Sequence, residues 1–236
     1  MPDKIKITES KLLSDNWYIL KKITYQLEKS DGKTETQSRE VYDRGNGATI
    51  LLYHKENKTV ILTRQLRIPT YLNGNETGMM IEACAGLLDQ DNAEDCIRRE
   101  TEEETGYQIS DPEKIFEVYM SPGSVTEIIH FFIAAYTKDM KVDEGGGLDE
   151  EQENIEVLEL PFETALNMVK SGEIKDAKTI MLLQYAQIND IFNRWFCKYG
   201  LRIFDLKNAL WNQIRSQKKT ICIRAIHTVS DMILQN

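Results

Sequence analysis

The sequence contains no apolar run of about 18 residues, so no membrane-spanning helix is expected. Its first ten residues, MPDKIKITES, are charged and lack the apolar core of a secretion signal. The four cysteines, Cys84, Cys96, Cys197 and Cys222, show no CxxC spacing, which favours free thiols in a reducing compartment. We therefore expect a cytoplasmic protein without a membrane partner.

Histidine is also scarce. The three histidines, His54, His130 and His227, are too few for a histidine-rich metal site. Any metal would be held by carboxylates, which favours a hard cation such as Mg²⁺, with Mn²⁺ as the alternative.

Net positive charge is confined to the C-terminal segment, and the rest of the chain is acidic. The net charge is -9, yet residues 191–236 hold eight basic and two acidic residues, a net of +6. The remainder therefore carries -15. An acidic body of this kind is not typical of a nucleic-acid-binding protein, so no nucleic-acid partner is expected.

The pattern of apolar residues indicates many strands and few helices, without repeats or low-complexity linkers. Alternating, β-branched and aromatic residues predict the strands, and Gly and Pro at segment ends mark the helices. The predicted strands are 16–29, 37–45, two within 47–67, 79–86, 114–123, 128–137 and 155–161, and the predicted helices are 93–105, 161–172 and 178–196. Elements that do not strictly alternate indicate an α+β domain with mixed sheets.

The stretch RRETEEETGY, residues 98–107, crowds four glutamates into five positions. On a helix Glu100, Glu103 and Glu104 share one face, and such like-charge pairs cost ~0.2–0.5 kcal/mol each unless compensated. A solvated acidic face next to Arg98 and Arg99 is the simplest explanation of an isolated glutamate run. Here an apolar strand ending in Ala85-Gly86 and a short loop precede the helix, so backbone and carboxylate oxygens can converge on a hard cation.

These residues resemble a known family. RETEEETGY, Arg99 to Tyr107, is similar to the Arg-Glu-apolar-x-Glu-Glu-x-Gly-apolar core of the Nudix box, and AGLLD at 85–89 resembles the stretch before it in nucleoside-diphosphate-sugar pyrophosphatases. Thr101, at a usually apolar position, and Asn92, where an acid is expected, depart from the pattern. VYDRGNGATILLY, TRQLRIPTYLNGNETG and GGGLDEEQENIEVLELPF extend the resemblance over about residues 1–190, most similar to the GDP-mannose pyrophosphatase branch.

The resemblance implies a Nudix fold, an α/β/α sandwich of mixed sheets and flanking helices with an added N-terminal strand subdomain. We expect residues 1–45 to form that subdomain and to contribute to dimerisation, residues 46–190 to form the Nudix domain, and residues 191–236 to form a basic, helical extension of unknown role. The implied enzyme is a Mg²⁺-dependent homodimer that hydrolyses GDP-mannose to GMP and mannose 1-phosphate.

Glu104 and Glu100 are the first choices for metal ligands, and Glu103 is a third acidic candidate. The resemblance adds the Ala85 carbonyl to the metal site and Gly86 and Leu87 to the substrate site. A loop glutamate of related enzymes, acting as metal ligand or general base, corresponds to Glu151, with Glu150 beside it for substrate and Glu153 as the alternative ligand. The predicted catalytic residues are Glu104, Glu151 and Glu103.

The predicted substrate residues outside that motif come from two lines of reasoning. Arg39 and Arg67 can each bind phosphate through two parallel hydrogen bonds, with an ordinary ion pair as the alternative. Trp17 can stack on a base, although a core or dimer-interface role is nearly as well supported. The resemblance alone adds Ser38, Glu40, Glu127 and Lys178.

Two other functions stay open. An ADP-ribose pyrophosphatase would share the metal chemistry. A catalytically silent Nudix-fold nucleotide-binding module is favoured by Asn92 and Thr101.

Overall fold

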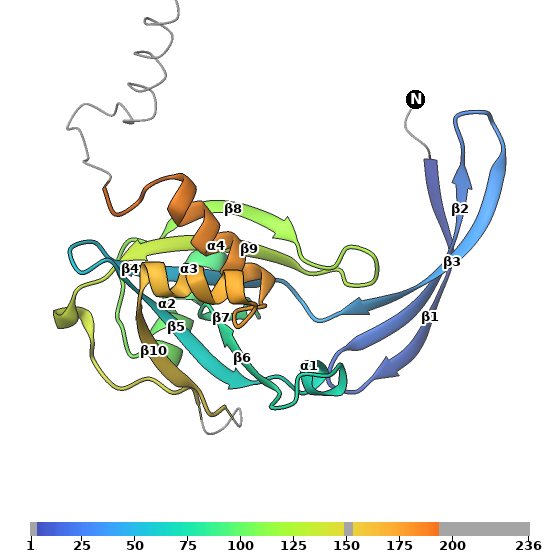
Figure 1. Ribbon diagram of the computed structural model, residues 1–236. Coiled ribbons are helices and arrows are strands. Elements are labelled where there is room, and N and C mark those ends of the chain that lie inside the picture. Colours follow the sequence, from blue (N-terminus) through green and yellow to red (C-terminus); the bar gives the residue numbers. More distant parts are fainter. Residues whose placement is uncertain (1–3, 149–152, 194–236) are drawn as a thin grey trace, which may run out of the picture. The chain divides into compact units, whose positions relative to one another are not determined.

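The computed structural model describes residues 4–148 and 153–193 of the 236-residue chain (Figure 1). Residues 194–236 of the predicted extension 191–236 and the loop residues Glu150 and Glu151 therefore lie outside the described residues. The described elements are, in chain order, β1 (Lys4–Asp15), β2 (Ile19–Glu28), β3 (Thr34–Asp43), β4 (Gly47–His54), β5 (Thr59–Leu66), α1 (Ile68–Leu72), β6 (Met79–Glu82), β7 (Ala85–Leu87), α2 (Ala93–Thr105), β8 (Glu113–Tyr119), β9 (Ile128–Ala135), η1 (Lys138–Met140), β10 (Glu156–Pro161), α3 (Phe162–Ser171) and α4 (Ala177–Ile188).

The strands form two sheets. The first is antiparallel, in the order β1-β2-β3. The second has seven strands in the order β10-β5-β4-β9-β8, with β6 paired to β5 and β7 paired to β4. It is mixed, because β4 and β9 run parallel while the other neighbours are antiparallel.

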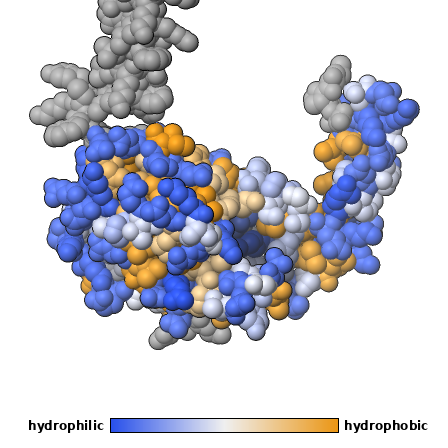
Figure 2. Space-filling model, viewed as in Figure 1, coloured by the Kyte–Doolittle hydropathy of each residue, from blue (hydrophilic) through white to orange (hydrophobic). Residues whose placement is uncertain are grey.

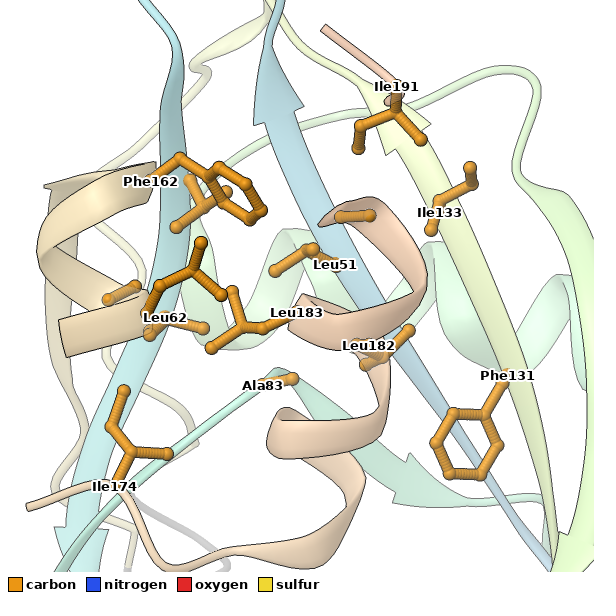
Figure 3. Close-up of a cluster of buried hydrophobic side chains, with 14 of the residues drawn as sticks. Leu51, Leu62, Ala83, Phe131, Ile133, Phe162, Ile174, Leu182, Leu183 and Ile191 are labelled. Carbon is orange, nitrogen blue, oxygen red and sulfur yellow. The ribbon is translucent and has the colours of Figure 1, made fainter. Parts of the chain in front are cut away.

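The seven-stranded sheet is covered on both faces because its central strands present apolar side chains to each side. Along β4, Leu51 joins the core under α3 and α4, whereas Ile50 and Leu52 join the core under α2. Figure 3 shows the first core, where Leu182 and Leu183 of α4 lie among the side chains of the sheet. The two cores make an α/β/α sandwich, which confirms the predicted α+β Nudix-type architecture.

The third predicted helix is too long. The sequence pattern predicts a helix over 178–196, but α4 ends at Ile188. Asp190 adopts a positive φ of 49° and turns the chain, since one residue in this conformation breaks the helical path. The turn lets Ile191 and Phe192 point into the core, where Phe192 packs against Tyr53 and Phe162. The compact unit runs to Phe192, two residues past the expected boundary at 190.

Three elements were not predicted: β1, α1 and the short helix η1. The strand β1, Lys4–Asp15, is exposed at nearly all positions, so it lacks the apolar face on which strand prediction rests; the alternation of Ile5 and Ile7 was the available signal. The single-turn helix α1, Ile68–Leu72, follows Arg67 and begins near Pro69, a residue that suits a first helical turn. No helix in the described residues combines the length and apolar character needed to cross a membrane.

Candidate active site

Helix α2 presents the glutamate cluster, and its ends explain its position. It spans Ala93–Thr105 as the sequence predicts. The Asn92 side chain accepts hydrogen bonds from the backbone N–H groups of Glu94 and Asp95, at 3.1 and 3.0 Å, and so caps the first turn. Gly106 ends the helix with a φ of 75°. Asn92 thus has a structural function that an acid at this position would also perform.

Glu104 is the most buried of the glutamates, with 2 % of its surface exposed. Its Oε2 accepts a hydrogen bond of 3.3 Å from the backbone N–H of Ala85 on β7. Burial, with smaller contributions from the charges of Glu100 and Glu153, raises the pKa of Glu104 to about 8. A buried carboxylate near two others is the environment in which a bound cation lowers the electrostatic cost most.

Glu100 lies against the backbone of the β7 segment. A Cβ atom at Gly86 would stand 1.9 Å from the Glu100 Cδ, so only glycine allows this approach. Residues Ala85–Leu87 are held beside α2 because β7 pairs with β4 in antiparallel register. The predicted metal and substrate residues of the AGL segment and of α2 are therefore brought together.

Arg99 organises two glutamates, as its position suggests. Its Nη2 lies 3.0 Å from Glu100 Oε1, and its Nη1 donates to Glu103 Oε2 at 2.9 Å. The Nε is 3.5 Å from the Asp91 carboxylate. Because one guanidinium serves three carboxylates, the repulsion expected within the glutamate run is offset.

Thr101, the other departure from the Nudix pattern, is fully buried. Its hydroxyl donates to the Ile97 carbonyl at 2.5 Å, one turn earlier in the helix. The hydroxyl is thus satisfied inside α2, and the methyl group packs as a small apolar residue would. Thr101 and Asn92 both fit the helix without removing a glutamate from the site.

The glycines before the second acidic run dock on the end of α2. Gly146 and Gly147 donate their backbone N–H groups to the carbonyls of Glu104 and Glu103, at 2.9 and 3.1 Å. A Cβ at Gly145 would lie 2.5 Å from the Glu104 carbonyl oxygen, and its φ is +67°. The composition alone suggests a solvated flexible loop, but these contacts attach the glycine segment to the helix.

A hollow of about 490 Å³ lies between α2 and this segment. Half of its lining residues are acidic; the lining comprises Arg99, Glu102, Glu103, Asp143, Glu144, Gly145, Gly147 and Leu148. Glu153 is the first described residue after positions 149–152 of this loop. Its carboxylate accepts a hydrogen bond from the Leu148 N–H at 3.3 Å. Within residues 4–148 and 153–193, no three histidine, cysteine, aspartate or glutamate side chains form a complete metal site.

Arg67 and Lys178 meet at a glutamate that sequence reasoning missed. Arg67 Nε donates to Glu82 Oε2 at 2.7 Å, and Lys178 Nζ lies 3.6 Å from Glu82 Oε1. Glu82 is 5 % exposed. The available signal was an acidic residue inside the otherwise apolar stretch MMIEACAG.

Four predicted substrate residues lie on the other sheet. Trp17, between β1 and β2, is 80 % exposed and therefore is not a core residue of this chain. On β3, the Ser38 hydroxyl bonds that of Thr24 at 3.0 Å, and Arg39 Nη1 donates to the Ser38 carbonyl at 2.8 Å. Glu40 is exposed and faces Lys22 in the β2–β3 register.

Glu127 stands near the junction of the two sheets. It is 8 % exposed and lies 3.4 Å from Arg44 Nε. Arg44 also stacks over the Tyr18 ring, 5.4 Å from its centroid, which stabilises the cation by cation–π attraction. The backbone of Tyr42 on β3 pairs with residues Ser124 and Thr126 just before Glu127. These contacts connect β3 and the β1–β2 turn to the segment that carries Glu127.

Comparison with known families agrees with this geometry. The NUDIX domain model matches residues 43–183, which include α2, the β7 segment and Lys178. The chain belongs to the Nudix hydrolases. The model described as the GDP-mannose pyrophosphatase NudK N-terminal domain matches residues 4–42, the region of β1–β3.

Curated relatives among the Nudix hydrolases match at high identity. A GDP-mannose pyrophosphatase of Escherichia coli O157:H7 is 55% identical over 193 residues, which are 82% of this chain and 100% of the relative. A GDP-mannose pyrophosphatase of Shigella dysenteriae serotype 1 (strain Sd197) matches with the same identity and coverage. Nudix hydrolases generally use a divalent metal ion.

Proposed function

We propose that this Nudix hydrolase cleaves the pyrophosphate bond of GDP-mannose to give GMP and mannose 1-phosphate. The observation that supports this most directly is the buried Glu104 beside Glu100 and the Ala85–Leu87 backbone. The relatives named GDP-mannose pyrophosphatase are matched over their whole length, and both family models cover adjoining parts of this chain. The free thiols Cys84 and Cys96 suit the reducing cytoplasm, where we place the enzyme.

We propose Mg²⁺ as the metal, with Mn²⁺ as a substitute. The donors that would hold it are the Ala85 carbonyl, Glu100, Glu104 and a carboxylate of the second acidic run, Glu151 or Glu153. An oxygen-only set of this kind suits a hard cation, and burial with nearby carboxylates, which raises the pKa of Glu104 to about 8, supports a site that favours added positive charge. When bound, the cation would neutralise phosphate charge and activate water.

Other residues of the chain would bind the phosphates, orient the glutamates and accept a proton. Arg67 and Lys178 bring two positive charges to one place and bind the phosphates of the substrate. Arg99 holds Glu100 and Glu103 in orientation. Glu103, on the wall of the hollow, and Glu151 are the candidates to accept the proton of the attacking water. Gly86, Leu87, Glu127 and Glu150 complete the proposed substrate site.

We further propose a homodimer in which Trp17, Ser38, Arg39 and Glu40 act in the active site of the partner chain. Figure 2 shows apolar side chains gathered on the surface of the N-terminal sheet. In β1, Ile5 and Ile7 are 69 % and 64 % exposed, and Trp17, at the β1–β2 turn, is 80 % exposed. Apolar groups exposed together on an edge strand are typical of an interface.

The substrate proposal is tested with a panel of GDP-mannose, other GDP- and UDP-sugars and ADP-ribose, each assayed with Mg²⁺ and again with excess EDTA. We expect the highest kcat/KM for GDP-mannose and no turnover in EDTA. A preference for ADP-ribose would replace the proposed substrate. Nucleotide binding without hydrolysis of any compound would identify a silent binding module.

Mixing two inactive variants tests the shared site. Arg39→Ala and Glu104→Gln should each be inactive alone, because each lacks one half of every site. After subunit exchange the heterodimer should recover one working site of two. Co-purification through an affinity tag on one variant would verify exchange, and a mixture that exchanges fully yet stays inactive would contradict the shared site.

A further inference from the structure

Glu82 is a buried carboxylate at the centre of a four-charge network, and none of the roles described so far uses it. It ends β6, is 5 % exposed, and contacts two cations through its two oxygens. Arg67 Nε donates to Oε2 at 2.7 Å, and Lys178 Nζ stands 3.6 Å from Oε1. Arg67 comes from the end of β5 and Lys178 from the first turn of α4. One side chain thus joins cations that are more than a hundred positions apart in the sequence.

The network extends to the backbone that leads to the metal segment. Asp176 caps α4 by accepting from the Thr179 N–H at 2.9 Å, and it accepts from Lys178 Nζ at 2.7 Å. The Thr179 hydroxyl donates to Asp176 at 2.7 Å and accepts from the Ala83 N–H at 2.6 Å. Ala83 follows Glu82 directly and stands two residues before Ala85. The same contacts that fix Lys178 therefore also fix the strand that enters the AGL segment.

The charge network leaves Arg67 able to bind an anion. Two carboxylates and two cations make the network neutral when empty, so the buried charges are compensated. In the described chain, the Arg67 guanidinium makes no other hydrogen bond or ion pair, and 41 % of its side chain is exposed. With Nε held by Glu82, its terminal nitrogens are presented in a fixed direction and can bind a phosphate in a bidentate manner.

We propose that Glu82 is a positioning residue that aligns Arg67 and Lys178 as one clamp for the diphosphate of the substrate. This inference rests on the proposed function, because the clamp is assigned to a nucleotide sugar. Removing the charge of Glu82 frees Arg67 to rotate and loosens Lys178, which keeps its bond to Asp176. A misplaced binding group weakens binding in the ground state and the transition state alike, so KM should rise while kcat stays close to the wild-type value.

The test compares two glutamate-to-glutamine variants, one expected to raise KM and one expected to leave it unchanged. Glu82→Gln keeps the size and removes the charge; Glu156→Gln makes the same exchange at the exposed Arg64–Glu156 pair, where Nη1 and Oε2 are 3.1 Å apart across β5 and β10. We expect KM for GDP-mannose to rise roughly ten- to a hundredfold in Glu82→Gln, with kcat changed less than about threefold, and no change in Glu156→Gln. Equal KM values in the two variants would refute the clamp.

A mutant cycle separates positioning from a general structural effect. If Glu82 acts through Arg67 and Lys178, then adding Glu82→Gln to a chain that carries both Arg67→Gln and Lys178→Gln should raise KM little further. Additive increases in KM would refute the inference. Should Glu82→Gln fail to fold, Glu82→Asp is compared in its place, since it keeps the charge but shortens the reach to both cations.

A binding experiment keeps this inference distinct from the proposed function. Titration of inorganic pyrophosphate into wild type, Glu82→Gln and Glu156→Gln needs no turnover. Weaker binding to Glu82→Gln alone supports the clamp even if no nucleotide sugar is hydrolysed, an outcome that would sink only the substrate proposal. Unchanged pyrophosphate binding together with normal hydrolysis would reject the clamp and retain the enzyme.

Discussion

Replacing Gly86 by alanine should abolish most activity while leaving the fold intact. The added Cβ would lie 1.9 Å from Cδ and 2.1 Å from Oε1 of Glu100. Because non-bonded carbon atoms pack at about 3.5–4.0 Å, the Glu100 carboxylate must move by about 1.5–2 Å. The obstructed atoms are the end of a flexible side chain, so Glu100 rotates away and the backbone keeps its place.

The cost to stability is small because two terms oppose each other. Displacing Glu100 breaks its contact with Arg99, a partly exposed ion pair of ~0.2–1 kcal/mol. The φ of Gly86 is not positive, so alanine also restricts the unfolded chain and returns about 0.4–1 kcal/mol. We expect the melting temperature to stay within about 4 °C of wild type. A metal ligand moved by more than 1 Å should lower kcat/KM about a hundredfold or more.

The assay follows GMP release from GDP-mannose over a range of Mg²⁺ concentrations, together with thermal unfolding. Gly123→Ala is the matched control, since a Cβ there meets nothing within 4 Å and the φ of Gly123 is not positive. The control should behave as wild type in both measurements. Full turnover of Gly86→Ala at the wild-type Mg²⁺ requirement would refute the assignment of Glu100 as a ligand.

Two further predictions concern the tail boundary and the buried glutamate. A chain ending at Asn193 should unfold at the wild-type temperature. A chain ending at Asp190 lacks the buried Ile191 and Phe192, so its free energy of unfolding, measured in urea, should be lower by roughly 3–5 kcal/mol. Equal stability of the two chains would contradict the core position of these residues. Without metal, Glu104 binds its proton more tightly when folded than when unfolded, because its pKa is about 8 rather than 4.5. The free energy of unfolding should therefore fall as pH rises from about 4.5 to 8 in EDTA, and Glu104→Gln, inactive but folded, should remove that part of the slope. An identical slope in the variant would show that Glu104 is not the titrating group.

Most helices and strands were predicted from patterns within short stretches of the sequence. The lack of Gly and Pro over 93–105 and the terminal Gly106 predicted α2 correctly, because these signals are local in the sequence; the Asn92 cap was seen only in the structure. The strands β2–β5 and β8–β10 were likewise predicted where apolar residues cluster, whereas the single strand predicted over 79–86 is divided into β6 and β7. The sandwich was implied by the resemblance to the Nudix family. The strand β1 escaped detection since an exposed strand leaves no buried face in the sequence.

The site needed contacts between distant segments. The local sequence does not indicate that position 86 must be glycine because Glu100 lies against it, or that Gly146 and Gly147 donate hydrogen bonds to carbonyls of α2. The partnership of Glu82 with Arg67 and Lys178 joins three separate elements, and Phe192 leaves the helical pattern because burial in the core outweighs one more helical turn. The sequence by itself determined the family, the glutamate helix and the chemistry of its oxygen donors. Only the tertiary structure decided which of those charges are buried and which cations face them, because burial and pairing depend on distances through space.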